Sequence, residues 1–145
     1  MKVRHADANR ESALRAVRRK WMVVDDNETI LRMTAEMLAM FTDAEICSFQ
    51  SPAEAVRAFE AGPSAFELVV TDFDMPEMNG AELCQRLRLS ALELKIILTT
   101  GSADISGTKA LTLGFDAFLA KPFPASALST ALEKVKHANL HLRAV

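Results

Sequence analysis

A chain of 145 residues has room for one ordinary domain, which at this size buries roughly 68–70% of the surface that its unfolded form exposes and needs no disulfide to hold its core. Its composition, 50% hydrophobic and 25% charged, is that of a globular protein and excludes a disordered or collagen-like chain. No apolar run reaches the length of a membrane span, and no apolar core follows the basic start as in a secretory signal, so we expect a cytoplasmic protein.

Charge is distributed unevenly along the chain. Residues 1–20 carry seven basic and two acidic side chains, a net charge of +5, whereas the remainder carries a net charge of −7. We interpret 1–20 as a basic extension, in which Leu14 and Val17 have a spacing that suits a helix, and 21–145 as the domain. Such an arm either contacts nucleic acid or a membrane surface, or pairs with the acidic domain or a partner. No module for reading a nucleic-acid sequence follows, so we expect no specific nucleic-acid binding.

Short apolar runs alternate with amphipathic stretches. Strands are predicted at 21–24, 45–49, 66–71, 96–98 and 115–119. Helices are predicted at 30–41 with Asn27 as the cap, from the cap Ser51 to about 61, from the cap Asn79 to about 89, at 103–113, and from 124 to about 140. The strands at 66–71 and 96–98 are apolar on consecutive residues, as in strands covered on both faces. Five strand–helix units predict an α/β fold, a doubly wound parallel sheet with helices on both faces.

Polar side chains follow four of these strands. Asp25 and Asp26 end the first strand, Asp72 the third and Thr99-Thr100 the fourth, and Lys121 follows the fifth. In an open parallel sheet, ligands bind at the carboxyl ends of the strands, so these groups converge on one edge. Any one of them alone is more simply a helix cap or a solvated loop residue. Their occurrence on four strands at the same end favours a site.

This set of side chains has a coherent chemistry. Carboxylates that lie close together repel one another and need a cation, and oxygen ligands with room for water suit Mg²⁺ or the similar Mn²⁺. A lysine offers a positive charge to a phosphoryl group, and a threonine hydroxyl can hydrogen-bond a phosphate oxygen. An aspartate can itself be the nucleophile and form an acyl phosphate. The sequence therefore predicts phosphoryl transfer to an aspartate.

Four motifs extend this interpretation. They are Val23-Val24-Asp25-Asp26, Asp72-Phe73-Asp74-Met75-Pro76-Glu77-Met78-Asn79-Gly80, Thr100-Gly101 and Lys121-Pro122-Phe123. In this order they resemble the receiver domain of two-component response regulators over about residues 20–140. The resemblance implies a flavodoxin-like (βα)5 fold with strand order 2-1-3-4-5.

The resemblance also implies a role for each matching residue. Asp72 resembles the phosphoacceptor, and Asp25 and Asp26 the acidic pair that organises the metal. Asp26, Asp72 and the backbone carbonyl of Asp74 resemble the direct ligands. Lys121 resembles the lysine that contacts the phosphate, and the peptide bond to the next residue, Pro122, is often cis in the family.

The switch residues are less clearly marked. Thr100 is followed by the small Gly101, as in the family, but lies about one residue too close to Lys121, whereas Thr99 has the usual spacing and a larger neighbour. We choose Thr100 as the switch hydroxyl and keep Thr99 as the alternative. The shortening falls near Ser106, so the helix at 103–113 is expected to be short. Phe118 is either the aromatic switch residue or a strand residue packed in the core.

These roles imply a signalling switch and not a conventional enzyme, with slow loss of its own phosphate as its only turnover. A histidine kinase or a histidine phosphotransfer protein would be the phosphodonor. A downstream protein would be contacted through the face of the fourth helix, fifth strand and fifth helix, and a homodimer is left open.

Two rival interpretations remain. Asp72-Phe73-Asp74 also resembles the nucleophile motif of haloacid-dehalogenase-type phosphatases, but that motif has Thr or Val where this chain has Pro76, and it lies on the first strand. The second rival is a receiver-like scaffold that binds partners without being phosphorylated.

Overall fold

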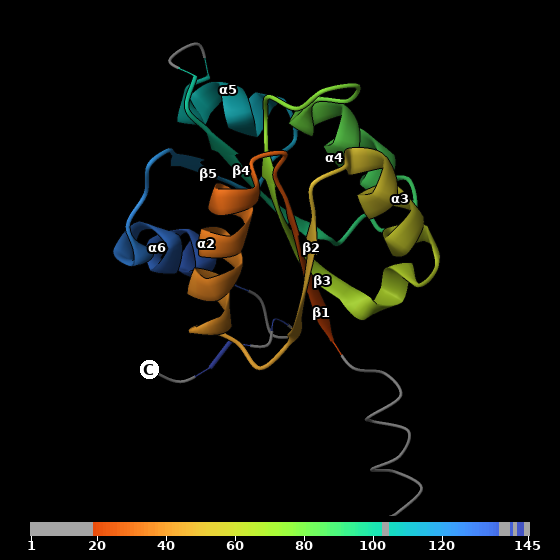
Figure 1. Ribbon diagram of the computed structural model, residues 1–145, viewed down its shortest axis with the longest axis horizontal. Helices are drawn as coiled ribbons and strands as arrows, with labels where there is room; N and C mark the ends of the chain where they lie inside the picture. Colours follow the sequence, from red (N-terminus) through yellow and green to blue (C-terminus); the bar gives the residue numbers. More distant parts are fainter. Residues whose placement is uncertain (1–18, 103–104, 137–139, 141, 144–145) are drawn as a thin grey trace, which may run out of the picture.

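A five-stranded parallel sheet forms the centre of the protein. The computed structural model describes residues 19–102, 105–136, 140 and 142–143. The strands are β1 Lys20–Val24, β2 Glu45–Phe49, β3 Phe66–Asp72, β4 Lys95–Thr100 and β5 Ala117–Ala120. Their order in the sheet is β2-β1-β3-β4-β5, and each neighbouring pair is parallel (Figure 1). The flavodoxin-like fold and the strand order predicted from the sequence are therefore confirmed.

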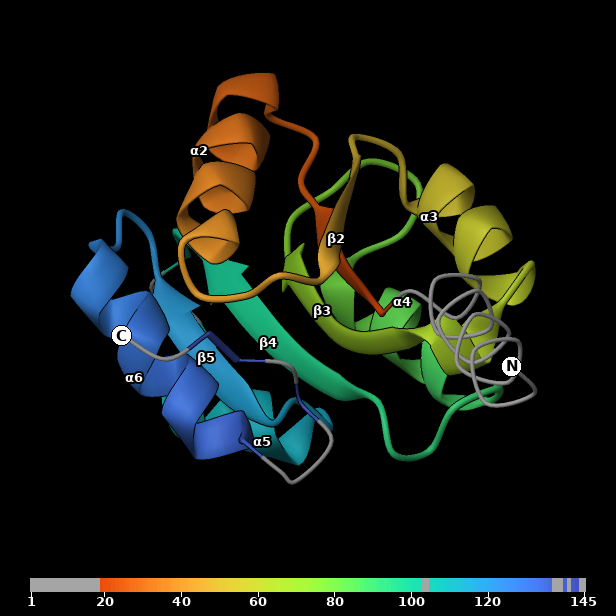
Figure 2. The ribbon, with the colours of Figure 1, turned by 90° about the horizontal axis from the view of Figure 1, so that it is seen from below.

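Helices cover both faces of this sheet, as Figure 2 shows from below. They are α2 Glu28–Ala39, α3 Pro52–Glu60, α4 Gly80–Arg88, α5 Gly107–Thr112 and α6 Ala125–Val135, and a 3-10 turn, η1, spans Pro63–Ala65. Residues of α2 and α6 join one core cluster, and residues of α3, α4 and α5 join the other. Because all the strands are parallel, each strand–helix crossover returns the chain to the amino end of the next strand.

The three predicted helix caps are present. The side-chain oxygen of Asn27 accepts a hydrogen bond from the Ile30 backbone N–H at 3.0 Å, and that of Asn79 accepts from Glu82 at 2.9 Å. Ser51 accepts from the Glu54 N–H at 3.3 Å. Each cap satisfies a backbone donor that the first turn of a helix leaves free. These local signals start α2, α4 and α3 directly after the predicted caps.

The core lies on both sides of β3, whose seven residues are all buried. On one face, Met22, Val69 and Ile96 pack with the helices α3 and α4. On the other, Val70 and Ile97 pack with α2 and α6. Because apolar side chains fill both faces, the polar side chains of the strands collect at their ends.

The fourth predicted helix is short, as the reduced spacing before Lys121 led us to expect. It was predicted over 103–113 and is α5, Gly107–Thr112, although residues 103 and 104 lie outside the described part. Ser106 caps it by accepting the Lys109 N–H at 3.2 Å. Serine is a favoured cap residue, and glycine has a low helix propensity. Together they favour a helix that begins at Gly107 over one that begins earlier, which explains the late start.

The fifth strand and last helix also differ from prediction. The strand was predicted over 115–119 and begins at Ala117, because Gly114 turns the chain with a φ of 97° and Phe115 packs into the core before the strand starts. The helix was predicted to reach about 140 and ends at Val135, where Lys136 adopts an extended ψ of 132°. Leu140 is buried beyond the helix, so its apolar character indicated burial and not helix.

The predicted basic extension lies almost wholly outside the described residues, which begin at 19. Of the part of the chain that the structure describes, no helix is both long and apolar enough to cross a membrane.

Candidate functional site

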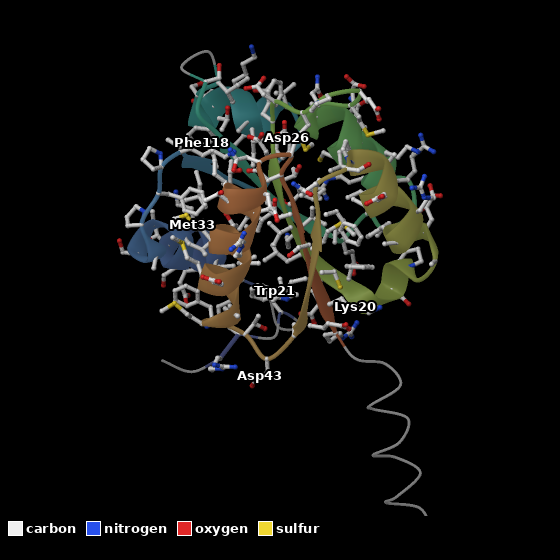
Figure 3. The ribbon with its side chains drawn as sticks, viewed as in Figure 1. Lys20, Trp21, Asp26, Met33, Asp43 and Phe118 are labelled. Atoms are coloured by element: carbon white, nitrogen blue, oxygen red, sulfur yellow. The ribbon has the colours of Figure 1, made fainter. Side chains whose placement is uncertain are left out.

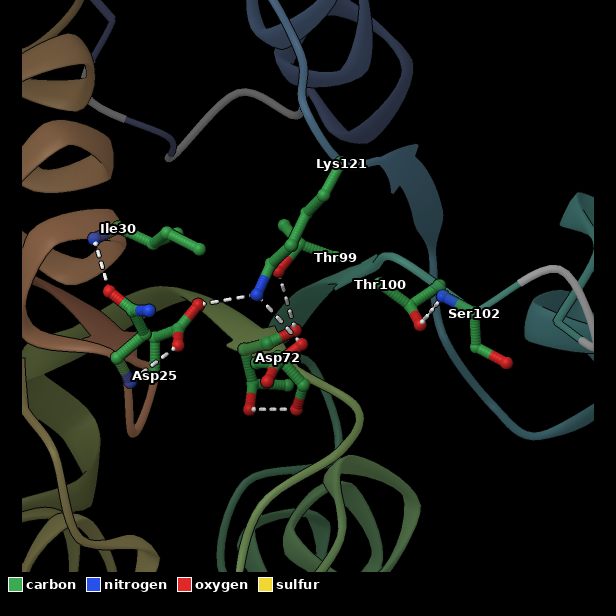
Figure 4. A network of polar contacts seen from close by, with 9 residues as sticks. Asp25, Ile30, Asp72, Thr99, Thr100, Ser102 and Lys121 are labelled. Carbon is green, nitrogen blue, oxygen red and sulfur yellow. Dashed lines mark hydrogen bonds and ion pairs between the residues drawn. The ribbon is translucent and has the colours of Figure 1, made fainter.

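Two residues that end strands and two that directly follow strands bring polar side chains together at the carboxyl end of the sheet. Asp25 follows β1, Asp72 is the last residue of β3, Thr100 is the last of β4, and Lys121 follows β5. Figure 4 shows Asp25, Asp72 and Lys121 pointing toward one another, with Thr99 beside them. These residues span almost 100 positions of the sequence, and only the parallel sheet unites them.

Lys121 is the centre of this cluster. Its Nζ lies 2.7 Å from Oδ2 of Asp25 and 2.9 Å from Oδ1 of Asp72. The Lys121 side chain is 15% exposed, and those of Asp25 and Asp72 are 4% and 8% exposed. Because water screens these charges poorly, the lysine offsets much of the repulsion between the two carboxylates.

Burial and mutual contact shift the pKa values of two of these groups. Burial raises the pKa of the Asp72 carboxyl, and the hydrogen bond and positive charge of Lys121 oppose this rise without cancelling it. Burial alone would lower the pKa of Lys121, but its hydrogen bonds to Asp25 and Asp72 outweigh burial and raise it. The lysine therefore remains an ammonium ion at neutral pH.

The acidic cluster has the composition of a divalent-cation site. One carboxylate oxygen from each of Asp25, Asp26 and Asp72 lies within 4.8 Å of the others. Oδ1 of Asp25 also accepts the Asn27 backbone N–H at 2.9 Å, so both Asp25 oxygens already have partners. Asp26 is exposed. A cluster of hard oxygen donors that includes one exposed acid fits Mg²⁺, and these three acids could hold such an ion.

The loop after β3 carries Asp74 and is held close to the strand. The Phe73 N–H donates to the Thr99 carbonyl at 3.0 Å, and the Gly80 N–H donates to the Phe73 carbonyl at 2.8 Å. A Cβ atom on Gly80 would lie 2.6 Å from the Asp72 carbonyl oxygen, so only glycine fits. This explains the glycine at the end of the motif: it lets α4 start against the strand that ends in Asp72.

The two threonines that end β4 lie on opposite faces of the sheet, because side chains alternate along a strand. Thr99 is the register partner of Asp72, and its hydroxyl donates to the Thr71 carbonyl at 3.4 Å. Thr100 is 1% exposed, and its hydroxyl accepts the Ser102 N–H at 3.0 Å. Thr99 thus shares a face with the predicted acceptor, and Thr100 lies on the other face.

Phe118 lies on the same face as Thr100. It is the register partner of Leu98, which is two residues before Thr100 in β4. Phe118 is partly buried and packs against the core cluster of α3, α4 and α5, so it is neither a full core residue nor a fully solvated one. The Lys121–Pro122 peptide bond is cis, as the family resemblance suggested.

Sequence reasoning missed two polar networks away from this edge. Glu67 lies in a strand predicted as an apolar run, yet it is buried and accepts the Trp21 indole N–H at 3.1 Å. Arg88 donates to the Leu94 carbonyl at 2.7 Å and to the Asp116 carboxylate at 2.7 Å. In the sequence, each network is marked only by a charged residue next to an apolar run. Such residues are common on solvated surfaces, so they did not predict a buried contact.

The known proteins that this chain is similar to include receiver domains and chemotaxis proteins. The family model "Response regulator receiver domain" matches residues 21–133. The chain is 30% identical over 125 residues to the chemotaxis protein CheY1 of Helicobacter pylori, covering 83% of this chain and 98% of that protein. It is 30% identical over 121 residues to a chemotaxis protein CheY homolog of Campylobacter jejuni, covering 80% of this chain and 91% of that one.

Solved structures agree with these matches. A response regulator receiver domain protein from Clostridium thermocellum superimposes with a TM-score of 0.72 at 27% identity, covering 81% of this chain and 93% of that one. The signal receiver domain of an HD domain-containing protein from Pseudomonas fluorescens does so with a TM-score of 0.70 at 25% identity, covering 81% and 94%. Receiver domains are phosphorylated on an aspartate and act as switches in two-component systems. The chain belongs to the response regulator receiver domain family.

Proposed function

We propose that this protein accepts a phosphoryl group on Asp72 from a histidine kinase or a histidine phosphotransfer protein and passes the signal on by protein contact. One observation carries the proposal: the Lys121 ammonium lies against Asp72 and Asp25, with Asp26 in the same cluster. A buried carboxylate with a lysine and two further acids beside it suits an acceptor whose phosphate is held by a metal and a lysine. A cytoplasmic location is part of the proposal.

The transfer itself requires little of the protein beyond position and charge. An Asp72 carboxylate oxygen attacks the phosphorus of a phosphohistidine, the phosphorus–nitrogen bond breaks, and the imidazole leaves with the electron pair of that bond. Lys121, already 2.9 Å from Asp72, follows the new negative charge onto the phosphoryl oxygens. When bound, Mg²⁺ would offset charge on those oxygens, and Asp26, Asp72 and the Asp74 carbonyl would hold it.

Asp25 has a different role in this proposal. It accepts hydrogen bonds from Lys121 and from the Asn27 backbone, so it orients the lysine and the start of α2. Asp25 would attract the metal by its negative charge and would help to position Lys121 and the start of α2 around it. This distinguishes it from the exposed Asp26, although the two are adjacent in sequence.

The readout would start from Thr100. Its hydroxyl is hydrogen-bonded to the Ser102 backbone, at the start of the connection to α5. Thr100 lies on the opposite face of the sheet from Asp72, so drawing its hydroxyl toward a phosphoryl oxygen requires the end of β4 to turn. This turn would move the connection to α5 and open space for Phe118, which lies on the same face as Thr100. The surface of α5, β5 and α6 would change, and a downstream protein or a second copy of the chain would read it. Thr99 remains the alternative hydroxyl, because it is the register partner of Asp72.

Phosphorylation with radiolabelled acetyl phosphate and Mg²⁺ tests the acceptor. We expect label on the wild type and on Asp43→Ala, and none on Asp72→Ala; Asp43 is an exposed acid at the opposite end of the domain from Asp26 (Figure 3). Chelation of the metal with EDTA should also abolish labelling. Equal labelling of Asp72→Ala and the wild type would refute the assignment, and absence of label from every form, including after incubation with a phosphorylated histidine kinase, would favour the scaffold.

A further inference from the structure

A second concave surface lies at the opposite end of the sheet from Asp72. It is a groove of about 380 Å³ between Arg19, which precedes β1, Phe66, which begins β3, and the loop 91–94 before β4. These are the amino ends of the strands, whereas the phosphoryl site lies at their carboxyl ends. The groove shares no residue with the proposed acceptor site, and the inference drawn from it does not rest on the proposed function.

The walls of the groove combine apolar and acidic side chains. Phe66 and Leu94 are buried in it, but Leu92 at its rim is 84% exposed. Glu67 and Glu93 supply negative charge. Glu67 is 6% exposed, and its Oε1 lies 3.4 Å from Nε of Arg19. Both oxygens of Glu67 already have partners, Arg19 and the Trp21 indole. A matching occupant would therefore offer apolar side chains to Leu92 and positive charge to Glu93.

Residues 12–18 of this chain have that composition and are joined through the chain to Arg19 in the groove wall. Their sequence is Ser-Ala-Leu-Arg-Ala-Val-Arg, with four apolar and two basic side chains and no acid. Arg19 is both the first described residue and part of the groove wall. Because consecutive residues span at most about 3.6 Å each, Val17 lies within about 7 Å of Arg19 in any conformation. An occupant tethered at this distance has a high effective concentration at the groove.

We propose that the groove is the docking site of the chain's own amino-terminal segment, residues 12–18. Leu14 and Val17 cover Leu92, and Arg15 and Arg18 face the exposed Glu93. The basic extension is thereby held at the amino end of the sheet, away from the acids around Asp72. This accounts for a strongly basic arm on an acidic domain without a nucleic-acid partner.

A double-mutant cycle in the full-length chain tests the proposal, with the folding equilibrium constant measured by urea denaturation. Leu92→Ser should lower this constant about tenfold, because it removes buried apolar surface. Leu111→Ser is the matched control, since Leu111 is 63% exposed on α5, and it should change the constant less than about twofold. In a Leu14→Ser/Val17→Ser background, the effect of Leu92→Ser should disappear.

Three outcomes would overturn the proposal. Leu92→Ser could lower the folding equilibrium constant no more than Leu111→Ser does, which would show that nothing covers the groove. Leu92→Ser could lower the folding equilibrium constant equally in the wild type and in Leu14→Ser/Val17→Ser, which would show that residues other than Leu14 and Val17 cover the groove. Finally, the coupling could rise with protein concentration in parallel with dimer formation in analytical ultracentrifugation, which would make a second copy the occupant. Because Leu92 is already exposed among the described residues, these variants keep the core intact.

Discussion

The ammonium group of Lys121 lies between two carboxylates that come from different strands. With Asp25 at 2.7 Å and Asp72 at 2.9 Å, it is a fixed counter-charge before any phosphate arrives. Two acids buried this deeply would repel each other strongly without it. A single side chain thus explains how β1 and β3 can both end in an acid at the same point of the sheet.

The two threonines of β4 give a test at the same scale. If Thr100 is the switch, Thr100→Ala should still accept label from acetyl phosphate but lose most of the change that phosphorylation causes in the NMR signals of Phe118. The reason is that Thr100 and Phe118 share a sheet face, whereas Thr99 lies with Asp72 on the other. The measurement is the chemical-shift difference of Phe118 with and without beryllofluoride, a mimic of the phosphoryl group.

Thr99→Ala is the matched control for this comparison. It removes a hydroxyl one residue away, whose 3.4 Å hydrogen bond to the Thr71 carbonyl is long, so its effect on stability should be about 1 kcal/mol or less. If beryllofluoride left the Phe118 chemical shifts unchanged in Thr99→Ala but shifted them normally in Thr100→Ala, the switch would be assigned to Thr99.

At the scale of elements, the loop from β3 to α4 is held by a close backbone approach. The Gly80 N–H contacts the Phe73 carbonyl, and the place of a Gly80 Cβ is already taken by the Asp72 backbone. The position of the acceptor and the start of α4 are therefore coupled. A change at the helix start must move the strand end or the helix.

Gly80→Ala should lower the free energy of unfolding by about 1–3 kcal/mol, the usual cost of inserting a methyl group into filled space. It should also slow labelling of Asp72, because the displaced atoms include the backbone of that residue. Urea denaturation and the rate of labelling measure the two effects.

Gly107→Ala serves as the control, because nothing lies within 4 Å of a Cβ there and the residue begins α5. It should leave stability unchanged or raise it by up to about 1 kcal/mol. If both alanine variants behaved alike, the close approach at Gly80 would not constrain the loop.

For the whole molecule, the acidic cluster links folding to metal. Only the folded sheet brings Asp25, Asp26 and Asp72 within 4.8 Å, so a divalent cation should bind the folded chain and not the unfolded one. Such binding stabilises by mass action, by about 2.7 kcal/mol at a hundred times the dissociation constant. For a domain of this size, that corresponds to a rise in Tm of roughly 5–10 °C.

We therefore expect Mg²⁺ to raise Tm in the wild type and to raise it much less in Asp26→Asn, with ionic strength held constant by NaCl. Glu36→Gln, a change at an exposed acid on α2, should keep the full rise. A rise of equal size in Asp26→Asn would mean that the cation acts by general screening and not at this cluster.

The sequence was most informative where local chemistry decides the structure. Asn27, Ser51 and Asn79 start helices through hydrogen bonds to residues three positions away, and these starts were predicted. The ends of elements were harder to predict: Leu140 is buried beyond the end of α6, and Phe115 packs into the core before β5 begins. In both cases a tertiary contact, invisible to periodicity, accounts for the apolar residue.

By itself, the sequence determined the alternation of strands and helices, the family, and the residue types at each strand end, because each depends on neighbours a few positions apart. Only the tertiary structure decided which of these residues touch. It showed that Lys121 joins Asp25 to Asp72, and that Thr99 and not Thr100 is the partner of Asp72 in the sheet. It also revealed the groove around Glu67. Register and burial arise from packing between distant segments, and one residue of register reverses the face on which a side chain lies.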